Sequence, residues 1–238
     1  FSSFYSDRAQ VTISDSQFTA VDGEPLADIT CQTAAITGST FTGVALRLNQ
    51  CDADLTANTI GGGAMMNRSP DLSGIDLEGA GSNIFAGTPA QRTLGLNDSR
   101  VPMGTTWQVA APSMAALYDS GSNVVSGRLD LAAGTVVKSQ SNGLRVADGG
   151  VLTAAGTEQA PVRITDWRDD TVGGDTNGDG ADTHASYQGW QAIGLDRSDQ
   201  QGQTGQQVTL QHVVTRYVRP FSSFYSDRAQ VTISDSQF

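Results

Sequence analysis

The 238-residue sequence contains little that favours helices. Only three of its 25 acidic residues are glutamate, and Lys138 is the single lysine among 14 basic residues. Glutamate and lysine are good helix formers, whereas the abundant aspartate and the 27 glycines favour turns. The sequence therefore predicts an all-β fold in which many short strands are joined by many turns.

Other absences limit the function. No run of apolar residues approaches the 18 that a membrane-spanning helix requires, so we expect no membrane span. The net charge of −11 and the absence of a basic stripe argue against nucleic-acid binding. The two histidines, His184 and His212, have no neighbouring nucleophile motif, and Lys138 lies within a strand-like run. We therefore expect a non-enzymatic protein.

The first 18 residues return without change as the last 18. Phe1–Phe18, the first copy, and Phe221–Phe238, the second copy, are separated by 220 residues. Strand-like runs flank the second copy, which indicates a cut through continuous structure rather than a linker. We expect residues 1–238 to form one continuous segment of a tandem array with a 220-residue period and identical neighbours head to tail. An engineered duplication is the alternative.

Shorter repeats indicate the fold. Ile13–Phe18, Ile36–Phe41 and Leu55–Ile60 share one pattern, in which two apolar residues enclose four small or polar ones. Their spacing of about 20 residues is typical of the coils of a parallel β-helix. Roughly ten coils should fit in one 220-residue period, with an axial length of about 35–50 Å. An antiparallel β-sandwich is the main alternative, with Asn142-Gly143 and Asp148-Gly149 as its best hairpin turns.

A run of motifs between Leu129 and Ile193 resembles a known family. The motifs are short apolar or glycine-led segments and one Asp-rich insertion: Gly134–Lys138, Gly149–Ala154, Gly156-Thr157, Pro161-Val162, Asp169–Asp182 and Gly189-Trp190. They resemble the right-handed parallel β-helix repeats of large secreted or surface-anchored bacterial proteins, in the pectate-lyase-like superfamily. This resemblance implies a right-handed parallel β-helix and an extracellular or cell-surface location. One departure is Ser139, where these repeats have an aromatic residue.

The acidic insertion, residues 166–188, is the candidate metal site. Asp175, Asn177 and Asp179 occupy positions 1, 3 and 5 of an EF-hand-like loop, and glycine follows at position 6. Ser186 stands at position 12 in place of the bidentate glutamate. The predicted calcium ligands are therefore Asp175, Asn177, Asp179, the Ala181 carbonyl, and one or more of Asp169, Asp170 and Asp182. The alternative is a solvated acidic loop without metal.

Two cysteines are also spaced by about one coil. Cys31 and Cys51 are 20 residues apart and should be neighbours along the axis. They form either a ladder of buried thiols or a disulfide between coils, and the sequence leaves both alternatives open. Without a nearby histidine they do not predict a zinc site.

Together these features predict a structural module of an extracellular fibre, sheath or adhesin stalk. Its partners would be adjacent identical repeats, and fibres could also associate sideways. The alternative is a carbohydrate-binding or carbohydrate-cleaving β-helix, in which Asp169-Asp170 would act on a glycosidic bond and Trp107, Trp167 or Trp190 would stack on sugars.

Overall fold

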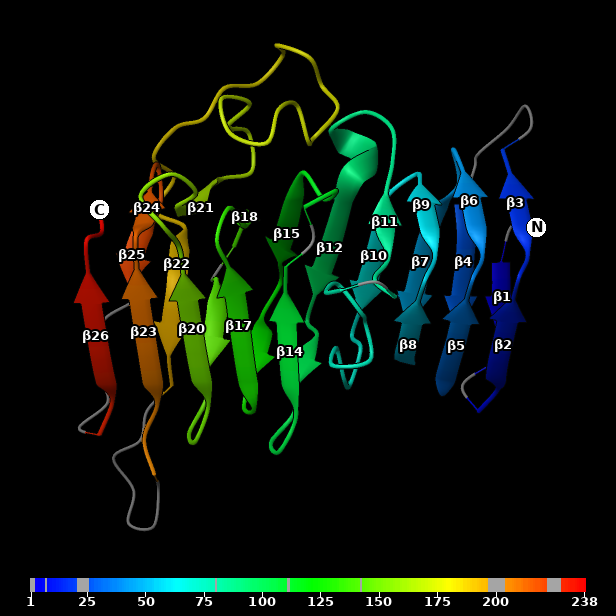
Figure 1. The fold of residues 1–238 in the computed structure, drawn as a ribbon, viewed down its shortest axis with the longest axis horizontal. Helices are drawn as coiled ribbons and strands as arrows, with labels where there is room; N and C mark the ends of the chain where they lie inside the picture. Colours follow the sequence, from blue (N-terminus) through cyan, green and yellow to red (C-terminus); the bar gives the residue numbers. More distant parts are fainter. Residues whose placement is uncertain are drawn as a thin grey trace.

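The computed structural model describes residues 3–6, 8–20, 26–79, 81–110, 112–141, 143–196, 204–221 and 228–238. The chain forms a parallel β-solenoid of about nine turns, with the two termini at opposite ends of its long axis (Figure 1). Every strand pair among the described residues is parallel. This excludes the antiparallel sandwich and confirms the expected all-β parallel fold.

One sheet runs the whole length of the solenoid, and we call it sheet A. Its nine strands, in order, are β1 (Ser3–Tyr5), β4 (Leu26–Thr30), β7 (Ala45–Asn49), β10 (Ala64–Asn67), β12 (Thr93–Asn97), β15 (Ala116–Ser120), β18 (Val136–Ser139), β21 (Val162–Asp166) and β24 (Val213–Thr215). At a strand spacing of about 4.8 Å, nine strands cover about 38 Å of axis. The length agrees with expectation, but the coils number about nine rather than ten, because the insertion uses residues without adding a coil.

Two further sheets complete the coils of the N-terminal half. Sheet B contains β2 (Gln10–Ser14), β5 (Thr33–Thr37) and β8 (Asp52–Thr56); sheet C contains β3 (Gln17–Thr19), β6 (Thr40–Thr42), β9 (Thr59–Gly61) and β11 (Ile84–Phe85). In this half the chain passes from sheet A to B to C in each turn.

Two other sheets complete the coils of the C-terminal half. Sheet D contains β13 (Arg100–Val101), β16 (Asn123–Val125), β19 (Leu144–Val146), β22 (Gln191–Leu195) and β25 (Arg219–Phe221). Sheet E contains β14 (Thr106–Val109), β17 (Arg128–Ala132), β20 (Val151–Ala155), β23 (Gln207–Gln211) and β26 (Gln230–Ser234). Here the chain passes from A to D to E, so the cross-section is rebuilt at mid-length.

The rebuilding takes place in the coil between β10 and β12. Ile75 still extends sheet B through a bridge to Leu55, while Ser69 already pairs with Arg100 of β13 through an N–H···O bond of 3.0 Å. Trp107 of β14 is buried and donates its indole N–H to the Ile75 carbonyl at 3.0 Å. This coil therefore has four sides, and the sequence pattern did not predict it.

The core follows the pattern read from the sequence. Ile13, Ile36 and Leu55 are in register in sheet B, and Phe18 and Phe41 stack with ring centroids 4.8 Å apart. Inward residues of all sheets form one buried cluster along the axis. Burial of apolar surface at about 25 cal/mol per Å² thus stabilises each coil against the next.

Residues 167–190 leave the wall between β21 and β22 and cover part of sheet A (Figure 1). This insertion runs back over earlier coils as far as the 3₁₀ helix η1 (Ala90–Arg92). Gly174 lies so close to Pro89 that a Cβ atom added there would be 2.9 Å from Pro89 Cγ. No helix in the described part of the chain is long and apolar enough to cross a membrane.

Candidate functional site

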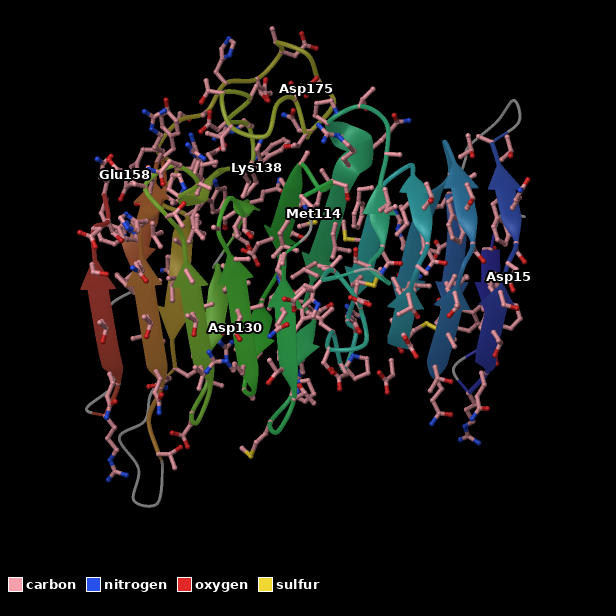
Figure 2. All side chains as sticks on the ribbon, viewed as in Figure 1. Asp15, Met114, Asp130, Lys138, Glu158 and Asp175 are labelled. Carbon is pink, nitrogen blue, oxygen red and sulfur yellow. A yellow bond between two sulfur atoms is a disulfide. The ribbon has the colours of Figure 1, made fainter. Side chains whose placement is uncertain are left out.

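Lys138 fixes the insertion to the solenoid. It lies on β18 with its side chain on the outer face of sheet A, where the insertion covers it completely (Figure 2). Its ammonium donates a hydrogen bond of 2.9 Å to the carbonyl oxygen of Gly174. The sequence placed Lys138 correctly in a strand, but its contact with the insertion was not predicted.

Asp169 fixes the first turn of the insertion. Its carboxylate is buried and accepts hydrogen bonds from the Thr165 hydroxyl at 2.7 Å and from the Thr171 amide at 3.1 Å. The Thr171 hydroxyl donates to it as well. Both carboxylate oxygens are therefore engaged in holding the loop, and this predicted metal ligand has a structural role in the described fold.

Three other carboxylates converge. Asp170, Asp175 and Asp179 each offer one oxygen, and these oxygens lie within 4.8 Å of one another. Of the predicted ligands, Ala181 and Asp182 are exposed and do not belong to this group. The structure therefore brings Asp170, rather than Asp169 or Asp182, to the two loop aspartates.

Hydrogen bonds arrange the loop around this group. Asp175 accepts from the amides of Gly178 at 2.7 Å and Gly180 at 3.0 Å, so its carboxylate closes the turn. Asn177 donates from its side-chain amide to Asp179 at 2.9 Å. Three buried oxygens have no hydrogen-bond donor: Oδ1 of Asp170, Asn177 and Asp179.

The electrostatics of the group favour a bound cation. Burial raises the pKa of the Asp170 carboxyl; Lys138 opposes that rise, and the carboxylates of Asp175 and Asp179 add to it. Burial also lowers the pKa of the Lys138 ammonium, while Asp170 opposes that change. Buried acceptors without donors are costly, and like charges in a small volume repel. A hard cation with oxygen ligands would relieve both costs.

A second polar cluster lies inside the solenoid. Asp119 of β15 is completely buried; its carboxylate accepts from the side-chain amide of Asn123 at 2.5 Å and from the Ser139 hydroxyl at 3.1 Å. Burial raises the pKa of Asp119 to about 6, although both hydrogen bonds lower it. Ser139, the departure from the family pattern, is thus the partner of a buried carboxylate.

Cys31 and Cys51 are joined by a disulfide, and their Cα atoms are 5.0 Å apart. Each cysteine follows a strand of sheet A, so the bond connects two successive coils at one corner. Of the two histidines, His184 is exposed in the insertion and His212 forms the left-handed turn between β23 and β24 (φ 47°).

The two copies of the repeated segment fold alike where both are described. β2 and β26 carry the same five residues at equivalent positions. Asp15 and Asp235, which follow them, both adopt the left-handed conformation, with φ of 47° and 50°. Residues 1, 2, 7 and 222–227 of the two copies lie outside the described residues.

Known proteins give no further identification. No protein-family model matches this chain, and neither a curated protein nor a solved structure matches it significantly.

Proposed function

We propose that the chain is one unit of a non-enzymatic tandem array that forms an extracellular fibre, sheath or adhesin stalk. The observation that carries this proposal is that one 18-residue sequence forms the first coil of the solenoid and, in the same strand conformation, its last coil. In an array, the second copy of one unit is the first copy of the next. The solenoid then continues without a linker.

Apolar side chains at the two ends support this arrangement. Ile233 and Phe238 of the second copy are 45% and 54% exposed. Their counterparts in the first copy, Ile13 and Phe18, pack against the core, and Phe18 stacks on Phe41. A following unit would therefore bury the side chains that are exposed in the second copy.

A protein with three tandem units tests the array. Small-angle scattering and negative-stain microscopy should show a straight rod that lengthens by about 40 Å for each added unit. Thr12→Pro at each internal junction removes one strand N–H and should bend the rod there. Separate bodies on flexible tethers in the unaltered protein would contradict the array.

We also propose that calcium binds the insertion through Asp170, Asp175 and Asp179, with Asn177 as an additional ligand. Calcium takes six to eight oxygen ligands, and the buried oxygens without donors lie within this group of residues. The bound ion would stiffen the insertion and so hold it against the wall.

Thermal unfolding in calcium and in chelator tests this site. Calcium should raise the melting temperature, with a stabilisation of about 2.7 kcal/mol when its concentration is a hundred times the dissociation constant. Asp170→Asn/Asp179→Asn should abolish the effect, whereas the exposed Asp182→Asn should retain it. Identical melting with and without calcium would leave the insertion as a solvated acidic loop.

A different observation favours carbohydrate binding as the alternative function. Tyr118 and Trp167 line a hollow of about 230 Å³ between sheet A and the insertion, together with Thr93, Thr176 and Asn177. Aromatic rings with nearby hydroxyl and amide groups suit a single sugar ring. Glycan-array binding that Trp167→Ala abolishes would support this alternative.

A further inference from the structure

The two copies show complementary contacts of what would be one coil in an array. The second copy contacts the coil before it: β26 pairs with β23 over five residues, from Gln207↔Gln230 to Gln211↔Ser234. The first copy contacts the coil after it: β2 pairs with β5, from Gln10↔Thr33 to Ser14↔Thr37. Because the sequences are identical, a junction coil would make both sets of contacts.

The corner after these strands shows that both sets are compatible. On the side of the preceding coil, the Val213 amide donates to Ser236 Oγ at 3.0 Å, and the Gln237 amide donates to the Val213 carbonyl at 2.8 Å. On the side of the following coil, the Ser16 amide donates to Ser39 Oγ at 3.2 Å. The Ser16 carbonyl also accepts from the Thr40 amide at 2.8 Å.

These two sets use different atoms. The contacts with the preceding coil use the serine hydroxyl and the backbone of the following glutamine, whereas the contacts with the following coil use the serine backbone. One junction serine can therefore satisfy both neighbours at the same time. The polar column at this corner would continue through Ser39 to Asn58, whose Oδ1 accepts from the Ser39 amide at 2.9 Å.

The two copies nevertheless belong to different sheets. β26 lies in sheet E, but its counterpart β2 lies in sheet B. Gln237 bridges to Val214 of β24 in sheet A, but its counterpart Gln17 lies in β3 of sheet C. The strand before β26 is β25 of sheet D, whereas the strand before β2 is β1 of sheet A.

We infer that the sheets change roles at every junction between units: sheet E continues as sheet B of the next unit, sheet A as its sheet C, and sheet D as its sheet A. This inference rests on the proposed tandem array. A sheet that begins as D in one unit, with five strands, would run through A of the second, with nine, and end as C of the third, with four. The mid-length rebuilding, where sheets B and C end and D and E begin, is what makes this exchange necessary.

The partner of each end is therefore a second copy of this unit in a defined register. Val214 of one unit should face Gln17 of the next, as it faces Gln237 within the chain. If the sheets kept their roles instead, β24 would pair with β1 of the next unit. Val214 would then face Phe4.

Cysteine cross-linking in a two-unit protein, residues 1–220 followed by 1–238, separates these arrangements. Val214→Cys in the first unit is combined with either Gln17→Cys or Phe4→Cys in the second. Val214→Cys/Gln237→Cys within the second unit is the positive control, because that pair is in register in the described chain. After mild oxidation, mass spectrometry without reduction measures each link, and the native Cys31–Cys51 pairs remain in all variants.

The pair with Gln17→Cys should link at a rate similar to the positive control and at least tenfold faster than the pair with Phe4→Cys. Faster linking of the Phe4→Cys pair would overturn the exchange of sheets while leaving a continuous solenoid. Failure of both pairs in a protein that scatters as one rod would also overturn the exchange. Failure of both in a protein that scatters as two separate bodies would refute the array itself.

Discussion

The buried carboxylate of Asp119 gives a stability prediction with a defined sign. Its pKa is raised by burial to about 6 from an ordinary 3.8, so the folded chain binds this proton more tightly than the unfolded chain does. Stability should therefore fall as the pH rises from about 4 to about 6 and then level off. At 1.36 kcal/mol for each pH unit, the charged carboxylate costs about 3 kcal/mol at neutral pH.

Asp119→Asn removes the charge and keeps the shape. The amide oxygen still accepts from Asn123, and the amide nitrogen donates to Ser139 Oγ. The hydroxyl of Ser139 can then turn to the Gln191 carbonyl, which lies 3.4 Å from it. We expect the variant to match the original chain at pH 4 within about 1 kcal/mol and to be more stable by up to about 3 kcal/mol at pH 8.

Urea unfolding at a series of pH values measures this difference. Subtracting the two free energies of unfolding at each pH cancels the other titrating groups, which both proteins share. Asp54→Asn, an exposed position on β8, is the control and should show a difference below about 0.5 kcal/mol throughout. A variant that is equally stable at pH 4 and pH 8 relative to the original chain, or less stable at pH 8, would refute the reasoning.

Three further changes test the fold and the anchoring of the insertion. Lys138→Met should cost about 2–4 kcal/mol and release the insertion, measured as faster tryptic cleavage there, because buried carboxylates lose their counter-charge; unchanged cleavage would contradict the anchor. Cys31→Ala/Cys51→Ala should lower the free energy of unfolding by about 3 kcal/mol, as expected for a 20-residue separation; an equal melting temperature in reducing buffer for both proteins would support it. Gly143→Ala should be much more destabilising than Gly104→Ala, although both have positive φ, because the added Cβ would lie 2.4 Å from a carbonyl oxygen of the next coil only at Gly143. Similar losses at both sites, by chemical denaturation, would show that coil contact is not the cause.

The sequence predicted those parts of the fold that repeat. The Ile13, Ile36 and Leu55 pattern gave the correct coil length and register, because each coil must place an apolar residue over the last one. The mid-length coil could not be predicted in this way, since Ser69 and Ile75 belong to a turn with four sides that has no equivalent elsewhere among the described coils.

The candidate site was predicted only where its residues are neighbours in sequence. Asp175 and Asp179 share one loop, so their convergence follows from spacing. Asp170 and Lys138 reach them through the path of the insertion, which no periodicity encodes. Ser139 was visible as an exception to the family pattern, but its reason, the buried Asp119, requires knowledge of which residues stack in register.

The insertion has a mechanical consequence for a solenoid of this kind. In a stack of coils that touch only their neighbours, pulling on one end peels the coils away one after another, each at a similar force. Residues 167–190 leave after β21 and reach back to η1, just before β12, so they connect coils that are not adjacent. The coils from β12 to β21 would then open together as one cooperative block, while the coils outside it unravel singly. Each unit would thus carry a clasp at its middle that limits how far tearing travels along the chain.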